Sequence, residues 1–497
     1  MSKVGYIWIM CMLLACVEVA AQTYERVSER NIWNSSENVT GVRQDSLSRS
    51  EARISAGYIG GGFRDAWEAS EGWSAGASTA SIRHLERMSL KGSFSFLQTE
   101  GYDMCGSMFI DPGFYPVDIL EFTPGRKTLQ TYSFEGGLSY DVSARWRIGA
   151  KIDFLSSNMA KRKDLRHVNW KLDMTVSPGF MYHCGNFAIG ASYLFSKNSE
   201  SVKADQLGTS DSSYYAFLDK GLMYGHYGVW TGGGLHLDEN GVNGFPVKEF
   251  RNGLALQVQY KGLFAEAGYS VRNGIIGEKE YIWFRYPGQE AFLLAGFQSG
   301  GHDVRLDLGW NTLELTETVL EKVSSNGITT VREHGNNRIL RQDIWNICPS
   351  YEYVSCRWEA GADLSLYGRE SMASQIYPYV GVQSLAMWSA GVHGMVRVWR
   401  FEVGASVGYA GGSLRDEGKL VQEGTGIQSG PYRLQQWYDL ETEYAVADRA
   451  KASLSLKYNI WRGIFVRAQG TYEHGFGLRY IKGSDRVGAV LELGYDF

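Results

Sequence analysis

The sequence predicts an all-β protein, namely an up-and-down antiparallel β-barrel that spans a membrane. Three observations predict it. Apolar residues recur at alternate positions, very short connections alternate with long ones, and the chain ends in one more alternating segment, Arg486 to Phe497. Alternate side chains of a strand point to opposite faces, so each segment has one apolar face and one small or polar face. Short turns at one end and long loops at the other are typical of membrane barrels, with the turns in the periplasm and the loops outside.

Composition fits this class and excludes others. The chain has 497 residues, a net charge of -5 and a sequence pI of about 6.1, so no basic surface suggests a nucleic-acid partner. The mean hydropathy of -0.25 argues against a helical membrane bundle. It is compatible with a barrel, because barrel strands are apolar at only every second position.

The amino terminus reads as a targeting segment, with residues 1–21 as a signal peptide. Lys3 supplies the charged start, Gly5 to Val17 the apolar core, and Val19-Ala20-Ala21 a cleavage site before Gln22. The alternative is a lipidation signal, Leu13-Leu14-Ala15-Cys16, which would attach lipid to Cys16. We expect residues 22–52 to form a periplasmic lead-in or a small plug, and residues 53–497 to form the barrel.

Alternating segments follow one another from Arg53 onward, and a period of two describes them better than a helical period. Counting them gives about 18 strands, or 14 or 16 if the weakest assignments, Arg53–Phe63 and Leu385–Trp399, fail. The clearest segments are Met88–Phe96, Tyr132–Tyr140, Trp146–Phe154, Leu172–Tyr182, Phe187–Phe195, Leu254–Tyr260, Leu263–Val271, Val304–Trp310, Ala360–Leu366, Phe401–Tyr409, Ala452–Ile460 and Ile464–Tyr472.

The connections sort by length. Short turns are expected near Val142–Ala144, Cys184–Asn186, Lys261–Gly262, Trp399–Arg400 and Ile460–Arg462, and long loops at Gln98–Lys127, Asn198–Arg251, Ile275–Gly288, Glu370–Ala386 and Gly412–Arg449. A soluble β-sandwich also has alternating strands. It hides its apolar faces between two sheets, however, and its connections need not sort by end.

Two stretches carry a family resemblance. The last segment, apolar at alternate positions and ending on Phe497, resembles the closing strand of Gram-negative outer-membrane β-barrels. Residues Gly106–Val142, which include Tyr115-Pro116-Val117-Asp118 and Thr123-Pro124-Gly125-Arg126-Lys127, are similar to an uncharacterised family of such barrels. The resemblance implies contact with outer-membrane lipid, recognition of the Phe497 strand by the barrel assembly machinery, and a TonB-dependent receptor as a candidate partner. It supplies no catalytic residue.

The polar face of the strands would line the lumen. Lumen-lining candidates are Glu135, Arg145, Arg147, Lys151, Asp153, Asp303, Arg305 and Asp307. Both signs of charge are present, so these residues either pair across strands or select the solutes that pass.

Two loops are candidates for a plug or a binding surface. The loop Gly101–Lys127 mixes apolar residues with three prolines, and either folds into the barrel mouth or packs against other loops. Its candidate residues are Tyr115, Asp118, Glu121 and Arg126. The longer loop Asn198–Arg251 carries aromatic residues that either hold a ligand or pack on the loop itself. Its candidates are Tyr214, Tyr215, Tyr227 and Trp230.

Signals of an enzyme are weak. Gly404-Ala405-Ser406-Val407-Gly408 matches the G-x-S-x-G pattern, but it lies inside an alternating strand and not on a strand-to-helix turn. No histidine pair or cysteine spacing predicts a metal site, and no cofactor is expected. We therefore predict no catalytic activity and a transport-related role, as a porin-like channel or as an accessory to an active uptake receptor. The alternatives are a closed barrel that binds partners through its extracellular loops and, third, an outer-membrane enzyme.

Overall fold

A computed structural model describes residues 31–44, 47–205, 215–223, 225–229, 243–277, 281–325, 328–374, 380–417 and 434–497. The predicted signal peptide and Cys16 lie outside these residues. The strands are β1 (Arg49–Gly61), β2 (Glu71–His84), β3 (Met88–Ser107), β4 (Asp118–Asp141), β5 (Trp146–Lys161), β6 (Arg166–Cys184), β7 (Phe187–Asp205), β8 (Tyr215–Asp219), β9 (Gly225–Val229), β10 (Asn243–Tyr260), β11 (Leu263–Gly277), β12 (Ile282–Ser299), β13 (His302–Ser325), β14 (Ile328–Val354), β15 (Trp358–Ala373), β16 (Gly381–Val398), β17 (Phe401–Glu417), β18 (Arg449–Trp461), β19 (Ile464–Gly475) and β20 (Asp485–Asp496).

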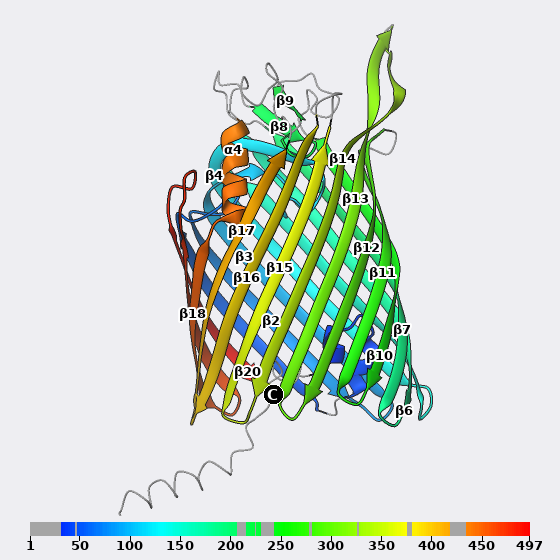
Figure 1. Ribbon diagram of the computed structural model, residues 1–497, viewed down its shortest axis with the longest axis vertical. Helices are drawn as coiled ribbons and strands as arrows, with labels where there is room; N and C mark the ends of the chain where they lie inside the picture. Colours follow the sequence, from blue (N-terminus) through cyan, green and yellow to red (C-terminus); the bar gives the residue numbers. More distant parts are fainter. Residues whose placement is uncertain are drawn as a thin grey trace, which may run out of the picture.

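The strands form a closed antiparallel barrel of 18 strands, which confirms the predicted fold class and strand number (Figure 1). Each barrel strand pairs with the next, β7 pairs with β10, and β1 closes the barrel on β20. The short hairpin of β8 and β9 lies at the end with the long loops, where β8 pairs with the first residues of β4. The first strand begins at Arg49, and not at Arg53 as expected.

The two faces of the wall differ as the alternation predicts. On β4, Phe134, Leu138 and Tyr140 are exposed on the outer face, while Ser139 between them is buried inside. An apolar outer face is stable because it contacts lipid. Trp146, Phe187, Trp358 and Phe401 are the first residues of their strands, directly after short turns, and are exposed at the level where an aromatic girdle contacts the membrane interface.

Short turns gather at one end and long connections at the other (Figure 1). The tight turns between β10 and β11 and between β16 and β17 place Lys261 and Trp399 at positive φ. The long connections are shorter than the sequence suggested: β3 continues to Ser107 and β4 begins at Asp118, so the loop expected over Gln98–Lys127 shrinks to residues 108–117. The strands extend above the membrane, where their outer face contacts water and need not be apolar. The alternating pattern therefore ends before the strands do.

Three helical elements complete the described chain: the 3₁₀ helices η1 (Ile32–Ser35) and η2 (Val39–Gln44), and α4 (Leu434–Val446). None of the described helices is long and apolar enough to cross a membrane. Residues 31–44, here called the amino-terminal segment, lie inside the barrel near the short-turn end, and α4 lies at the opposite end, which we call the mouth (Figure 1). The expectation that α4's stretch belongs wholly to a loop, Gly412–Arg449, was wrong.

Candidate functional site

The mouth is partly filled by residues 108–117, here called the mouth loop. Its apolar residues belong to one large cluster with inward-facing side chains of the barrel wall, and also with Ala216 and Leu218 of β8. The structure thus combines the two arrangements that the sequence left open. The buried members from the mouth loop are Met108, Phe109, Tyr115 and Val117, and those from the wall include Val202, Phe245, Val247, Ile276, Phe284, Tyr286, Leu315, Leu340 and Ala373.

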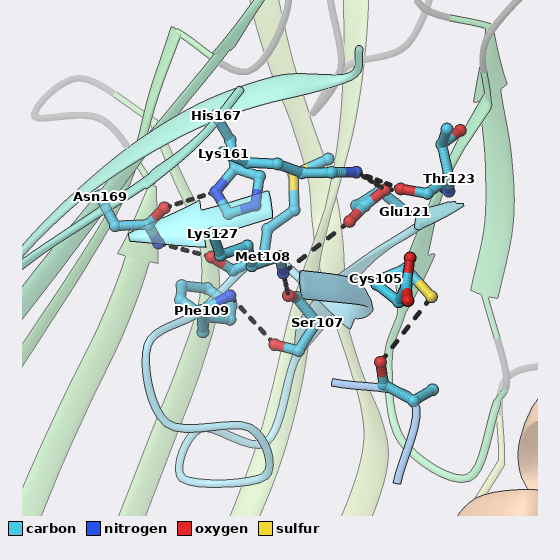
Figure 2. A network of polar contacts seen from close by, with 12 residues as sticks. Cys105, Ser107, Met108, Phe109, Glu121, Thr123, Lys127, Lys161, His167 and Asn169 are labelled. Carbon is cyan, nitrogen blue, oxygen red and sulfur yellow. Dashed lines mark hydrogen bonds and ion pairs between the residues drawn. The ribbon is translucent and has the colours of Figure 1, made fainter. Parts of the chain in front are cut away.

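A buried polar network holds the two ends of the mouth loop (Figure 2). The Glu121 carboxylate pairs with Lys161 and lies 3.8 Å from the Lys127 ammonium, and the three side chains are at most 3% exposed. Lys127 Nζ donates to the Ser107 carbonyl oxygen at 2.8 Å, and Asn169 Nδ2 donates to the Met108 carbonyl oxygen at 2.6 Å. Because every charge in this network has a partner, it fixes the loop ends on the β4–β6 side of the wall.

The middle of the mouth loop is tied to the same side. The Ile110 backbone N–H donates to Glu200 Oε1 at 2.9 Å, and the Tyr115 hydroxyl donates to Asn198 Oδ1 at 2.5 Å. Lys171 on β6 pairs with Asp111, and its ammonium lies 4.4 Å from the centre of the Phe114 ring. The loop therefore lies against one side of the lumen.

Helix α4 covers the other side of the mouth. Leu434 and Tyr438 are buried in a second apolar cluster with Leu120, Phe122, Phe217 and Met223. The Tyr438 hydroxyl donates to Asp416 Oδ1 at 2.9 Å and accepts from the inward-facing Gln383 at 2.7 Å. The sequence does contain a signal for this helix. Tyr438 follows Leu434 by four residues and Glu441 follows Tyr438 by three, which places all three side chains on one face of a helix.

A cavity of about 290 Å³, here called the mouth cavity, lies between α4, the mouth loop and the wall of β14–β16. Inward residues of the wall, among them Gln342, Tyr367, Arg369 and Met387, form one side. The β1–β2 connection contributes Asp65 and Trp67, the end of β8 contributes Asp219, and the residues after β8 contribute Met223. Tyr115 and Asp118 of this lining were predicted from the sequence. The residues from α4 were not, and they are Trp437, Tyr438, Glu441, Thr442, Tyr444 and Ala445.

The mouth cavity is rich in carboxyl groups. Burial raises the pKa of Asp65 and of Asp219 to about 7, and the charge of Glu441 adds to both shifts. Burial likewise raises the pKa of Glu441. It raises the pKa of Asp118 well above its usual range; Asp118 is the first residue of β4 and lies above the membrane. The Glu441 side chain is exposed to solvent and lines the cavity. Within the described ranges, no group of three or more His, Cys, Asp or Glu side chains is arranged to hold a metal ion.

Most predicted lumen residues are paired with neighbours inside the barrel. Glu135 pairs with Lys91 at 2.8 Å and Arg305 with Asp303 at 2.8 Å. The remaining pairs are Arg147 with Asp141 at 2.9 Å, Lys151 with Asp153 at 3.1 Å, and Lys151 with Glu37 of the amino-terminal segment at 3.6 Å. Asp307 is exposed although its position in the alternation faces inward. Arg145 was predicted to line the lumen, but it lies in the exposed turn before β5 and not on a strand.

The predicted residues of the two loops lie in different surroundings. Glu121 anchors the mouth loop, whereas Arg126 pairs with Glu100 on a partly exposed surface away from the cavity lining. Tyr214 and Trp230 lie outside the described residues. Tyr215 and Tyr227 belong to β8 and β9, of which the structure places the backbone but not these side chains.

The amino-terminal segment covers the inner wall below the mouth loop. Trp33 packs on Phe264 with ring centres 4.9 Å apart, and its indole N–H donates to Gln259 at 2.8 Å. Asn38 fits over Gly179 and Gly190, where a Cβ atom would come within 2.8 Å and 2.7 Å of its side chain. The segment lies against the wall between β3 and β13, and the mouth loop packs on the same side, where its apolar cluster extends to Leu340 on β14 and Ala373 on β15.

On the opposite inner wall, β15–β20, several inward side chains below α4 are exposed, and we call this stretch the open wall. Asp363 and His393 face inward on β15 and β16, yet their side chains are 57% and 43% exposed. Lys451 on β18 is 65% exposed, and Val490 on β20 faces inward at 38% exposure. Inward side chains stay exposed only where nothing packs on them, so this side of the lumen is accessible to solvent.

A family model described as a family of unknown function, DUF6850, matches residues 40–497. No curated protein matches. Among solved structures, the FrpB iron transporter of Neisseria meningitidis in its apoprotein form is 9% identical, with 93% of this chain and 83% of that chain covered and a TM-score of 0.43. The ferric-catecholate import receptor Fiu of E. coli K12 is 8% identical, with 91% and 82% covered and a TM-score of 0.42. OmpT of Vibrio cholerae is 15% identical, with 84% and 100% covered and a TM-score of 0.34.

Proposed function

Because the chain belongs to DUF6850, a family of unknown function, we propose its role from its own geometry: it is an outer-membrane barrel that conducts small solutes along its open wall and is restricted at the mouth. The observation that carries the proposal is the division of the lumen into a filled side and an open side. A barrel of this strand number is wide enough for a lumen even when one side is occupied.

The open wall continues downward from the mouth cavity on the same two strands. Tyr367, Arg369 and Met387 line the cavity on β15 and β16. Asp363 and His393 follow on the inner face of the same strands, nearer the short-turn end. Below them, the Arg397 guanidinium pairs with Glu359 at the last inward positions. A solute that leaves the cavity would therefore move along an unobstructed polar surface.

The mouth loop and α4 are the restriction in this proposal. The mouth loop is fixed by buried ion pairs and apolar contacts, so we expect it to stay in place during conduction. Helix α4 is hydrogen-bonded to the wall through Tyr438 and to the β19–β20 connection through Glu443, which accepts from the backbone N–H groups of residues 479–481. It lies between the cavity and the outside. Movement of α4 would open the cavity without unfolding the wall.

Conductance across a planar bilayer tests the proposal. The refolded chain from residue 22 should give small, brief openings, because the mouth is only partly closed. Replacement of residues 109–116 by a short Gly-Ser linker should give larger and longer openings. The matched control shortens the β13–β14 hairpin at residues 322–331, which rises above the barrel and should leave conductance unchanged (Figure 1).

The second candidate is a closed barrel that binds partners through its mouth, and the apolar anchoring of the mouth loop favours it. Absence of current in both the parent and the loop-shortened variant, after insertion has been verified, would favour this candidate over conduction. Co-purification from cross-linked membranes would then show whether a TonB-dependent receptor or another surface protein is the partner. Deletion of Phe497 should slow assembly, as expected if β20 is the strand that the assembly machinery recognises.

A further inference from the structure

We infer that the mouth cavity binds a small organic cation, an ammonium group carried on an apolar or aromatic body, with the Glu441 carboxylate as its charge partner. The inference adds a ligand class to the proposed function. It rests on that function only for the passage of the ligand through the barrel after binding. It is carried by the charge of the cavity, the hydrogen-bonding state of Glu441 and the aromatic lining.

The charge of the lining is strongly one-sided. Asp65, Asp118, Asp219 and Glu441 face a single cation of the lining, Arg369. Arg369 is itself engaged, because its guanidinium donates to Gln383 Oε1 at 2.9 Å. A cation is attracted by those carboxyl groups that are ionised, and its binding favours their ionised form, whereas an anionic ligand has only Arg369 to pair with.

Glu441 differs from the other three carboxylates in having no donor. Asp118 accepts from the Ile119 backbone N–H at 2.6 Å and from the Ser107 hydroxyl at 2.8 Å. Asp65 and Asp219 accept from backbone N–H groups at 2.5 Å and 2.8 Å. Among the residues that the structure describes, no hydrogen bond or ion pair reaches the Glu441 carboxylate. The Glu441 carboxylate is therefore the one acid of the lining that takes its hydrogen bonds from water, and a ligand ammonium would supply a charged donor in place of that water.

The charges around Glu441 agree with this role. Burial raises its pKa, and Arg369 opposes the shift only through space. The negative charge of Glu441 in turn raises the pKa of Asp65, Asp118 and Asp219. A cation bound at Glu441 would relieve this mutual repulsion, so its binding would be favoured by more than a single contact.

The remaining lining suits the body of such a ligand. Seven aromatic side chains border the cavity, and they are Trp67, Tyr115, Phe122, Tyr367, Trp437, Tyr438 and Tyr444. Aromatic faces attract ammonium groups and pack against rings and alkyl chains. Aromatic side chains alone would also suit a neutral sugar. The carboxyl groups of the lining favour an organic cation over such a neutral ligand.

Isothermal titration of the refolded chain from residue 22 in detergent micelles tests the inference. Tyramine is the probe, and tyrosol, which carries a hydroxyl in place of the ammonium, is its matched control. We expect tyramine to bind at least about tenfold more tightly than tyrosol, the effect of one charged hydrogen bond. Equal binding of the two compounds, or no binding of tyramine, would overturn the inference without needing any variant.

Variants then locate the site. Glu441→Gln should weaken tyramine binding about tenfold or more, and leave tyrosol unchanged. Asp439→Asn makes the same charge change two residues away on α4, outside the cavity lining, and should bind tyramine as the parent does. Equal losses in both variants, or none in Glu441→Gln, would also overturn the inference. Because binding is measured without flux, a non-conducting barrel that binds tyramine would refute the proposed conduction and still support the cation site.

Discussion

The Asn38 side-chain amide donates to Gln257 Oε1 at 3.0 Å, and so ties the amino-terminal segment to the inner face of β10. The same amide reaches the Phe180 carbonyl oxygen on β6 at 3.0 Å, and its carbonyl oxygen accepts from the Thr40 hydroxyl at 2.6 Å. Asn38 is fully buried. One side chain thus connects β6 and β10, the strands on either side of β7, with the segment that covers them.

Gly190→Val should displace this segment, because the new Cβ atom would lie 2.7 Å from the Asn38 side chain. Loss of the buried hydrogen bonds costs about 1–3 kcal/mol, so trypsin cleavage after Arg43 should accelerate about tenfold or more. Arg43 is otherwise held by Asp141 at 2.6 Å. The control is Gly470→Val, where nothing lies within 4 Å, and cleavage should match the parent. Equal cleavage in all three proteins would mean that Asn38 does not hold the segment.

Glu121→Ala should release the mouth loop. The substitution leaves Lys127 and Lys161 buried without a carboxylate, which destabilises a structure by about 3–5 kcal/mol. Hydrogen–deuterium exchange in residues 108–117 should rise sharply. Glu100→Ala removes the carboxylate of the more exposed pair with Arg126 and should cost at most about 1 kcal/mol. Similar exchange in the two variants would argue that the network does not anchor the loop.

Acid should stabilise the mouth. The pKa of Asp65 and of Asp219 is raised to about 7, chiefly by burial and further by Glu441, so the folded mouth binds protons more tightly than the unfolded chain. Glu68 adds to the shift of Asp65, and the backbone N–H groups of Ala66 and Gly221 oppose the shifts. Stability is therefore highest below about pH 4, where both forms of the chain are protonated, and falls as the pH rises toward 7.

Amide exchange in β8 and α4, corrected for the intrinsic effect of pH, measures this dependence. Exchange should slow when the pH is lowered from about 8 to about 5, a range that includes the raised pKa values. In the Asp219→Asn variant the side chain at this position cannot ionise, so the pH dependence of exchange should be smaller. Faster corrected exchange at the lower pH would contradict the assignment of raised pKa values.

Asp363→Asn should change the selectivity of the channel. Its carboxylate faces the lumen on the open wall and is 57% exposed, so it contributes to the field that passing ions meet. In a salt gradient, the reversal potential should shift toward anions. Asp343→Asn makes the same change on the outer face of β14 and should leave the reversal potential unchanged. An unaltered potential in Asp363→Asn would place the ion path elsewhere.

Sequence alone determined the wall of the barrel. Successive side chains of a strand point to opposite faces, so each strand can be recognised from its own residues. The number of strands, 18, the final strand before Phe497 and the aromatic residues after short turns could all be predicted in this way. It also identified Tyr115 and Asp118, because a loop with many apolar residues must bury them somewhere. Pairing among the lumen charges was left open, since opposite charges on neighbouring strands meet only in one register.

Only the tertiary structure decided what lies inside the wall. Asn38 finds its place over Gly179 and Gly190, more than a hundred residues away, and no local pattern encodes that fit. Likewise, Asp65, Asp219 and Glu441 come from three separate connections, and they meet because the closed barrel brings its loops together over one mouth. A strand's faces follow from its own residues, whereas the contents of a lumen depend on contacts between segments that the chain keeps far apart.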